Sequence, residues 1–301
     1  MKKFIYIILS LTISLTLFGC TKGKSYDIVA TMYPQYSISK EIAGDKLNVL
    51  MLYPPAVDIH NHEFSSQDII KINNSKLFFY TSDIIEPKIQ RMTLKNTEVI
   101  NLEALINHEH DEHEYEEHDH AHSHYWTSFS ALKEMSQIIY EKIISIDNLN
   151  SDYYLKNYNQ LLAKIKEIET NTRELILQSE TKTIFFAGHN SMEAFANEMN
   201  LTITALVDDI KPSADITSKQ ILDLVNKIKE VKASILYIPE LESIKIANTI
   251  KRAVEKENVK LEILELHGFH NITKNQMDSN VSIINLLTQN YENLKRGLSN
   301  D

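Results

Sequence analysis

The chain has 301 residues, 41 acidic against 31 basic side chains, and a formal net charge of −10 at pH 7. We therefore expect no binding to nucleic acid, because affinity for a phosphate backbone depends on Lys and Arg contacts. The single cysteine, Cys20, excludes an internal disulfide. With only six glycines and six prolines, the composition favours a compact, helix-rich body of one large domain or two ordinary ones.

The start of the chain has the pattern of a secretory signal. Lys2 and Lys3 precede an uncharged run, residues 4–18, that is shorter than a membrane-spanning helix. The run ends in Leu-Phe-Gly-Cys, which resembles the bacterial lipobox, the signal for lipidation of Cys20 and cleavage before it. We expect a signal peptide at 1–19 and a lipid anchor and tether at 20–26, on the outer face of a bacterial cytoplasmic membrane. An ordinary signal with an incidental cysteine is the alternative.

Strand-like apolar segments alternate with helical ones in two similar halves. The predicted strands are 28–32, 47–52, 77–80 and 98–102, then 183–186, 202–206, 234–238 and 261–266. Predicted helices at 37–42 and 67–72 separate the first strands, and long helical patterns cover 130–146 and 152–178, with a break at 148–150. Alternating strands and helices imply parallel pairing. We predict an α/β fold with lobes at 27–128 and 181–301, joined by long linking helices within 129–180.

Four histidines lie where predicted strands or loops end. His60 follows the second strand, His189 and His267 directly follow strands of the second half, and His124 closes an acidic loop before a helix. In parallel sheets, ligands bind beyond the carboxyl ends of the strands. A lone histidine there is usually solvated or hydrogen-bonded, but two histidines from each half are expected to meet in a cleft between the lobes.

A tract rich in histidine and acid, residues 107–124, contains seven of the twelve histidines. This composition is typical of metal binding. Besides His124, the candidate accessory ligands are His108, His110, His113, His118, His120 and His122. Three interpretations remain open, namely a solvated insert without a role, a weaker metal-capture site, and a sensor that alters transport when metal is plentiful.

Segments along the whole chain occur in the order found in one known family. They read DIVATMYPQYSISKEIAGDKLNV, PPAVDIHNHEFSSQDI, HSHYWTS, FFAGHNSMEAFANEMNL, ALVDDIKPSADITSKQILDLVNKIKE and ILYIPELESIKIANTIK. Together with the lipobox they resemble the metal-binding lipoproteins of bacterial ABC importers for zinc and manganese, the cluster A-I solute-binding proteins. The resemblance implies two α/β lobes on a backbone helix, a metal site in the interlobe cleft, and delivery of the ion to a membrane permease by a monomeric protein.

The same resemblance implies the ligand set. It assigns the first three ligands to His60, His124 and His189, and the fourth to the position of His267, where the family usually has Asp or Glu. His270, a water or a nearby acid such as Glu265 remain alternatives for that fourth ligand.

The chain also departs from the family pattern in its loops. Members of the family it resembles usually have Gly near Ala56 and Pro at the position of Ile59, so the turn that leads to the first ligand is expected to differ in detail. Glu63 and Asp68 match the family pattern after that ligand, whereas Ser128 and Phe129 replace a frequent Asp-Pro.

The histidines predict which metal is carried. Imidazole suits zinc, copper or nickel, whereas manganese prefers more carboxylate oxygen. The family's manganese-binding members typically carry a carboxylate at the position of His189. The histidine found there in this chain therefore also favours Zn²⁺. A manganese- or other metal-binding member of the family is the alternative. Glu240, at a strand end facing the same cleft, is our candidate for orienting a ligand imidazole. A solvated loop acid is the other interpretation of Glu240.

Two other function classes fit parts of the sequence. His60-Asn61-His62-Glu63 superficially resembles the H-x-H of metallo-hydrolases, but the chain has no H-E-x-x-H and no second zinc-site signature. We therefore expect no enzymatic activity, and we place His62 at the rim of the cleft. An envelope zinc store or adhesin is the third class, which the acidic loop fits but which does not require a two-lobed body.

Overall fold

The computed structural model describes residues 25–57, 59, 62–106, 124–207 and 216–298, which form two four-stranded parallel sheets. The first sheet has the order β2-β1-β3-β4, and the second has the order β6-β5-β7-β8. The strands of the first are β1 (Ile28–Ala30), β2 (Val49–Met51), β3 (Leu77–Tyr80) and β4 (Glu98–Asn101). Those of the second are β5 (Thr183–His189), β6 (Thr202–Val207), β7 (Ile235–Ile238) and β8 (Glu262–Glu265). The predicted α/β fold with two similar parallel-sheet lobes is confirmed.

Short helices complete each lobe. The N-terminal lobe contains α2 (Tyr33–Ala43), α3 (Ser66–Asn73) and the 3₁₀ turns η2 (Ile89–Arg91), η3 (Glu103–Leu105) and η4 (Tyr125–Thr127). The C-terminal lobe contains α6 (Glu193–Met199), α7 (Ser218–Val231), α8 (Ile244–Glu255), α9 (Lys274–Asp278) and α10 (Ile283–Leu298). Helix α10 was not among the predicted elements.

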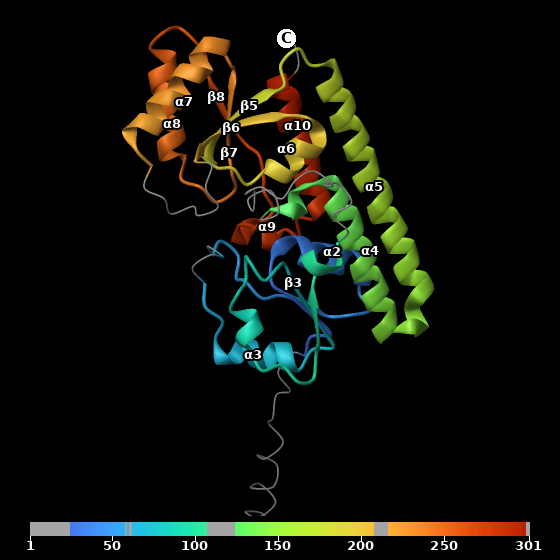
Figure 1. Cartoon of the computed structure of the whole chain (residues 1–301). Coiled ribbons are helices and arrows are strands. Elements are labelled where there is room, and N and C mark those ends of the chain that lie inside the picture. The colour runs from blue at the N-terminus through green and yellow to red at the C-terminus, as the bar shows by residue number, and fades with distance from the viewer. Residues whose placement is uncertain (1–24, 58, 60–61, 107–123, 208–215, 299–301) are drawn as a thin grey trace, which may run out of the picture.

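Two antiparallel helices join the lobes along one side of the molecule (Figure 1). Helix α4 (Phe129–Ile146) and helix α5 (Ser151–Gln178) are separated by the 3₁₀ turn η5 (Asn148–Asn150), where the break was predicted. The 28 residues of α5 span about 42 Å. Its buried side chains recur at steps of seven, four and three residues, which places them on one face, and the helix contacts both α2 and α10. This helix therefore packs against both lobes.

The start of α4 is held by the opposite lobe. Ser128 caps the helix through a bond from the main-chain N–H of Ala131. The Glu198 carboxylate of α6 accepts hydrogen bonds from the main-chain N–H groups of Phe129, at 2.6 Å, and Ser130, at 3.0 Å. A carboxylate is favourable at a helix N-terminus, where N–H groups lack partners within the helix. The contact fixes η4, and with it His124, against the C-terminal lobe.

One apolar cluster runs through both lobes and the linking helices. Its members include Ile28 and Ile38 of the N-terminal lobe, Ile165 of α5, and Phe186 and Leu287 of the C-terminal lobe. Smaller clusters lie on the outer face of each sheet. The lobes are therefore not separate bodies on a linker but share a core.

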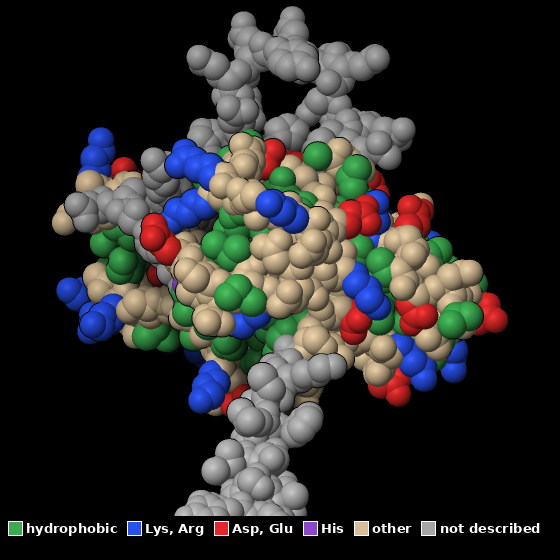
Figure 2. Space-filling view, turned by 90° about the horizontal axis from the view of Figure 1, so that it is seen from below, with side chains coloured by type: hydrophobic (Ala, Val, Ile, Leu, Met, Phe, Trp, Pro, Cys, Tyr) green, Lys and Arg blue, Asp and Glu red, His purple; other side chains and the backbone are tan. Residues whose placement is uncertain are grey.

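The surface carries charges of both signs. Figure 2 shows acidic and basic side chains interspersed around the lower face of the molecule, with apolar and uncharged groups between them. Within the described ranges, every helix is too short or too polar to cross a membrane.

Candidate metal centre

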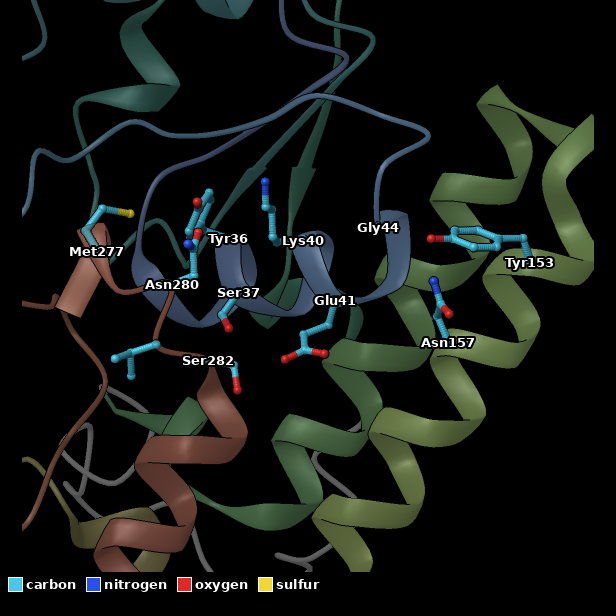
Figure 3. Close-up of a pocket in the computed structure, with 11 residues that line it drawn as sticks. Tyr36, Ser37, Lys40, Glu41, Gly44, Tyr153, Asn157, Met277, Asn280 and Ser282 are labelled. Carbon is cyan, nitrogen blue, oxygen red and sulfur yellow. The ribbon is translucent and has the colours of Figure 1, made fainter.

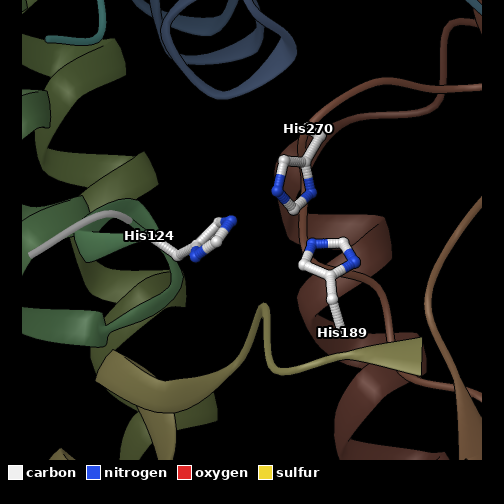
Figure 4. A group of neighbouring side chains, drawn as sticks. All are labelled: His124, His189 and His270. Atoms are coloured by element: carbon white, nitrogen blue, oxygen red, sulfur yellow. The ribbon is translucent and has the colours of Figure 1, made fainter. Parts of the chain in front are cut away.

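Three histidines from three separate segments converge between the lobes. His124 immediately precedes η4, His189 is the last residue of β5, and His270 lies in the loop after β8. One ring nitrogen from each lies within 4.8 Å of the others, and Figure 4 shows the rings turned toward one another. All three residues are buried, at 3%, 8% and 9% exposure. Within the described residues, this group has the composition and spacing to hold a metal ion.

The strand of His189 is longer than predicted. Strand β5 continues past Phe186 and includes His189, with a shift in its pairing to β6 between these two residues. The main-chain N–H of Asn190 then bonds to the carbonyl of Val207 at the end of β6. His189 is thus held by sheet pairing rather than by a free loop.

Trp126 forms a wall of the site that the sequence did not predict. Its buried indole meets the His124 and His270 rings edge-on, with centroid separations of 5.3 Å in both cases. Its Nε1–H donates to the carbonyl oxygen of Gly268 at 2.9 Å. The indole therefore excludes water on one side of the histidines and ties the segment after His124 to the loop that carries His270.

Glu240 orients His270. Its carboxylate accepts bonds from the main-chain N–H groups of Gly268, at 2.7 Å, and His270, at 2.8 Å. The same Oε1 lies 2.9 Å from Nδ1 of His270. Because a carboxylate can only accept, Nδ1 carries the proton, and Nε2 presents its lone pair. This is the arrangement by which acidic partners orient metal-binding histidines.

His267, the predicted fourth ligand, does not lie in the three-histidine group. Its ring is fully buried, and Nδ1 accepts a bond from the main-chain N–H of Phe269 at 2.9 Å. The proton of the neutral ring must then be on Nε2, so neither nitrogen is ready to bind a metal. The structure places His270, the alternative, beside His124 and His189 instead. Glu265, a further alternative, bonds to Gln289 and is not in the group either.

The Glu240 carboxyl is held in its ionised form although it is buried. Burial raises the pKa of Glu240, but attraction to positive charge on His267 and His270, together with the hydrogen bonds from His270 and Gly268, outweighs burial and holds the pKa well below its usual range. Burial lowers the pKa of His267, which favours its neutral form. The Glu240 carboxylate is therefore ionised near neutral pH and remains an acceptor for its donors.

Other predicted residues have structural partners or lie outside the described residues. Asp68 completes a capping box with Ser65 at the start of α3, and Glu63 forms an ion pair with Lys88. His62 packs edge-on against Tyr53 rather than joining the histidine group. The predicted sites that lie outside the described residues are Cys20, His60, His108, His110, His113, His118, His120 and His122.

The sequence has identified relatives over nearly its whole length. Residues 28–297 match the family model described as zinc-uptake complex component A, periplasmic. The high-affinity zinc uptake system protein ZnuA of Bacillus subtilis is 30% identical over 295 residues, which cover 92% of this chain and 89% of the relative. The zinc-binding lipoprotein AdcA of Streptococcus pneumoniae is 25% identical over 98% of this chain, which spans 61% of AdcA.

Solved structures share the fold. The metal-dependent lipoprotein YcdH of Bacillus subtilis superposes with a TM-score of 0.75 at 24% identity, over 90% of this chain and 99% of that one. The zinc-binding protein TroA of Treponema pallidum gives 0.75 at 15% identity, over 92% and 100%. With a family match that covers residues 28–297 and a ZnuA relative at 30% identity, the chain belongs to the family of zinc-uptake complex component A proteins.

Proposed function

We propose that this protein captures Zn²⁺ between its lobes and delivers it to the permease of an ABC importer, without catalysing a reaction. The observation that carries the proposal is the convergence of His124, His189 and His270 from three separate segments. His60, from the N-terminal lobe, is the proposed fourth ligand on the family pattern. His270 replaces His267 in the ligand set because its Nε2 is presented and that of His267 is not.

The spacing of the histidines suits zinc. Tetrahedral zinc with Zn–N distances of about 2.0–2.1 Å requires nitrogens about 3.4 Å apart. The ligand atoms lie within 4.8 Å of one another, so small ring rotations complete the coordination. Binding requires neutral imidazoles, and we therefore expect affinity to fall as the pH drops below about 6.

The engagement of Glu240, the carboxylate that contacts His270 in the described part of the chain, supports zinc over manganese. Both oxygens of Glu240 already accept bonds, one from Gly268 and the other from His270. It therefore orients an imidazole and is not available as an oxygen ligand. A site built from nitrogen alone suits zinc, whereas manganese prefers more oxygen.

The remaining parts of the proposal concern location and the acidic tract. Lipidated Cys20 would anchor the protein, as a monomer, at the outer face of the cytoplasmic membrane, where it meets the permease. A protein that holds its ion in a complete set of side-chain ligands leaves no open position for a reactive water, which supports a binding role over hydrolysis. The tract before His124 would collect further zinc ions weakly.

Metal competition on residues 21–301 lacking 107–121 tests this function. Zinc, manganese and copper are offered together with a chelator, and bound metal is quantified. We expect one tightly held zinc that manganese does not displace, and additional weak sites only when the tract is present. Preference for manganese would contradict the ligand set, and loss of the tight site with the tract would favour a zinc store.

A matched pair of variants tests the fourth ligand. His270→Ala should remove tight binding, because it deletes a ligand. His267→Asn should retain it, because the Asn amide oxygen can still accept the Phe269 N–H bond. If His267→Asn loses zinc and His270→Ala does not, the assignment is wrong.

A further inference from the structure

The loop after β8 bonds to the N-terminal lobe as well as carrying His270. The loop comprises residues 267–271, and its next residue, Ile272, accepts a bond at its carbonyl from the N–H of Ala56 at 2.8 Å. Asn271 reaches the same segment of the N-terminal lobe, residues 54–57. These contacts link the 267–271 loop to the segment that precedes His60. The Trp126 bond to Gly268 links the same loop to the segment that follows His124.

Asn271 makes the main side-chain contribution to this link. It is 1% exposed, and its Nδ2 donates to the carbonyl oxygens of Pro54 and Val57, each at 2.9 Å. Its Oδ1 accepts from the N–H of Ile272 at 2.8 Å. The amide is therefore fully engaged, with both of its Nδ2 donors directed across the interlobe boundary.

The segment that Asn271 holds has a conformation that its own sequence does not favour. Ala56 has φ +63°, in the left-handed region that alanine seldom adopts. Glycine enters this region without a steric cost, whereas the Cβ of alanine makes it unfavourable. A strained residue persists only when its surroundings fix it. Here the fixing contacts come from Asn271 and Ile272 of the opposite lobe.

We propose that Asn271 is a positioning residue for zinc retention, which holds residues 54–57 in place for the ligand segment that follows them. The inference rests on the proposed function. Asn271 directly follows His270 in the chain. The same loop therefore carries one proposed ligand, His270, and restrains the segment that precedes another, His60. Without the two bonds from Nδ2, only the Ala56 bond to Ile272 still holds the segment across the boundary, so the segment leaves its strained conformation more often, and the ion escapes faster while its entry is unchanged.

The test is the rate of zinc dissociation from the full chain in detergent, measured by mixing the zinc-loaded protein with excess chelator. Asn271→Ala removes the donors, and Asn271→Leu removes them while keeping more of the volume. Loss of two neutral hydrogen bonds should speed the slow dissociation phase about ten-fold, with association unchanged. No change in either variant would overturn the proposal.

Asn157→Ala is the matched control. Asn157 of α5 also donates a side-chain bond to a distant main-chain carbonyl, that of Ile42 at 3.0 Å. It lines a polar pocket between α2, α5 and the segment before α10, whose lining contains no histidine (Figure 3). This variant should lower thermal stability but leave zinc dissociation unchanged. An equal acceleration would mean general loosening and would refute a positioning role.

A second background separates positioning from a direct effect on His270. Here the readout is zinc affinity in competition with a weak chelator, because His60→Ala removes a proposed ligand and with it tight binding. If Asn271 acts through the segment before His60, then Asn271→Ala should weaken the residual binding little once His60 has been replaced. An undiminished effect in the His60→Ala background would refute the proposal. Failure of the wild-type chain to show any slow zinc phase would instead refute the proposed function, so the two failures are distinguishable.

Discussion

Replacement of Glu240 by glutamine should weaken zinc binding although Glu240 is not one of the proposed ligands. Three donors converge on two carboxylate oxygens, namely the Gly268 N–H on Oε2 and the His270 N–H and Nδ1–H on Oε1. Glutamine has one oxygen and one NH₂ group. In either orientation, its NH₂ group must face at least one of these N–H donors.

The expected size of the effect depends on which of these hydrogen bonds the glutamine side chain loses. If the amide oxygen keeps both His270 bonds, the buried Gly268 N–H loses its partner, which costs about 1–3 kcal/mol. If it faces Gly268 instead, the His270 ring loses its acceptor and can adopt the tautomer with the proton on Nε2. Loss of such an orienting partner typically weakens metal binding about 10- to 100-fold. Since the pKa of Glu240 is held well below its usual range, the wild-type carboxylate is ionised and keeps its acceptor role near neutral pH, where the comparison is made.

Competition with a chelator of known affinity measures the effect, and Glu265→Gln is the control. Glu265 is also partly buried near Glu240, but it bonds to Gln289 and to none of the histidines. We expect Glu265→Gln to bind zinc like the wild type. Equal zinc affinity together with equal thermal stability in wild type and Glu240→Gln would show that the Gly268 and His270 donors have other acceptors, and the reasoning above would be refuted.

Two further substitutions should have measurable effects. In Gly268→Ala the new Cβ would lie 3.1 Å from Ser191 Oγ and 3.2 Å from the His270 ring, so the ring must shift and zinc affinity in chelator competition should fall. Glu86 is buried, and burial raises its pKa to about 7. Because the folded state then binds a proton that the unfolded state releases, the stability of the wild type should fall as pH rises from about 4.5 to 7. Glu86→Gln should reduce this loss of unfolding free energy between pH 5 and pH 8 by up to about 3 kcal/mol, as measured by denaturant unfolding at both pH values. Identical pH dependence of stability in the wild type and the variant would contradict the raised pKa of Glu86.

The fold was predictable because the signal is local. Buried parallel strands appear as short apolar runs, and α5 repeats buried side chains at helical spacing, so both are visible in short windows. Helix α10 was missed, and its buried stripe contains a polar residue, Asn290, among Leu286, Leu287 and Leu294. The Asn290 amide bonds to both the N–H and the carbonyl of His267. Asn290 is thus buried because it bonds to a loop outside its own helix. A polar residue at such a position interrupts the apolar pattern by which a helix is predicted from sequence.

The choice between His267 and His270 could not be made from the sequence. Both follow β8 by a few residues, and only the path of the loop decides which ring faces His124 and His189. That path turns at Phe269, whose φ of +64° is one that a bulky residue rarely adopts. The turn is held by Glu240, about thirty residues earlier, and by the Trp126 bond to Gly268. Contacts of such long sequence separation leave no local pattern.

The shared core bears on how the ion leaves. Domains on a flexible linker are expected to move relative to one another unless their interface is large and apolar. Here Ile38, Ile165 and Leu287 belong to one buried cluster, and α5 packs against both α2 and α10. Rotating the lobes apart would expose this cluster to water at about 25 cal/mol per Å² of apolar surface. Shifting residues 54–57 and the 267–271 loop breaks only a few hydrogen bonds, so release should proceed through these loops. Crystal forms with and without zinc should therefore superpose as whole bodies and differ at these loops, and a large rotation of one lobe against the other would refute this account.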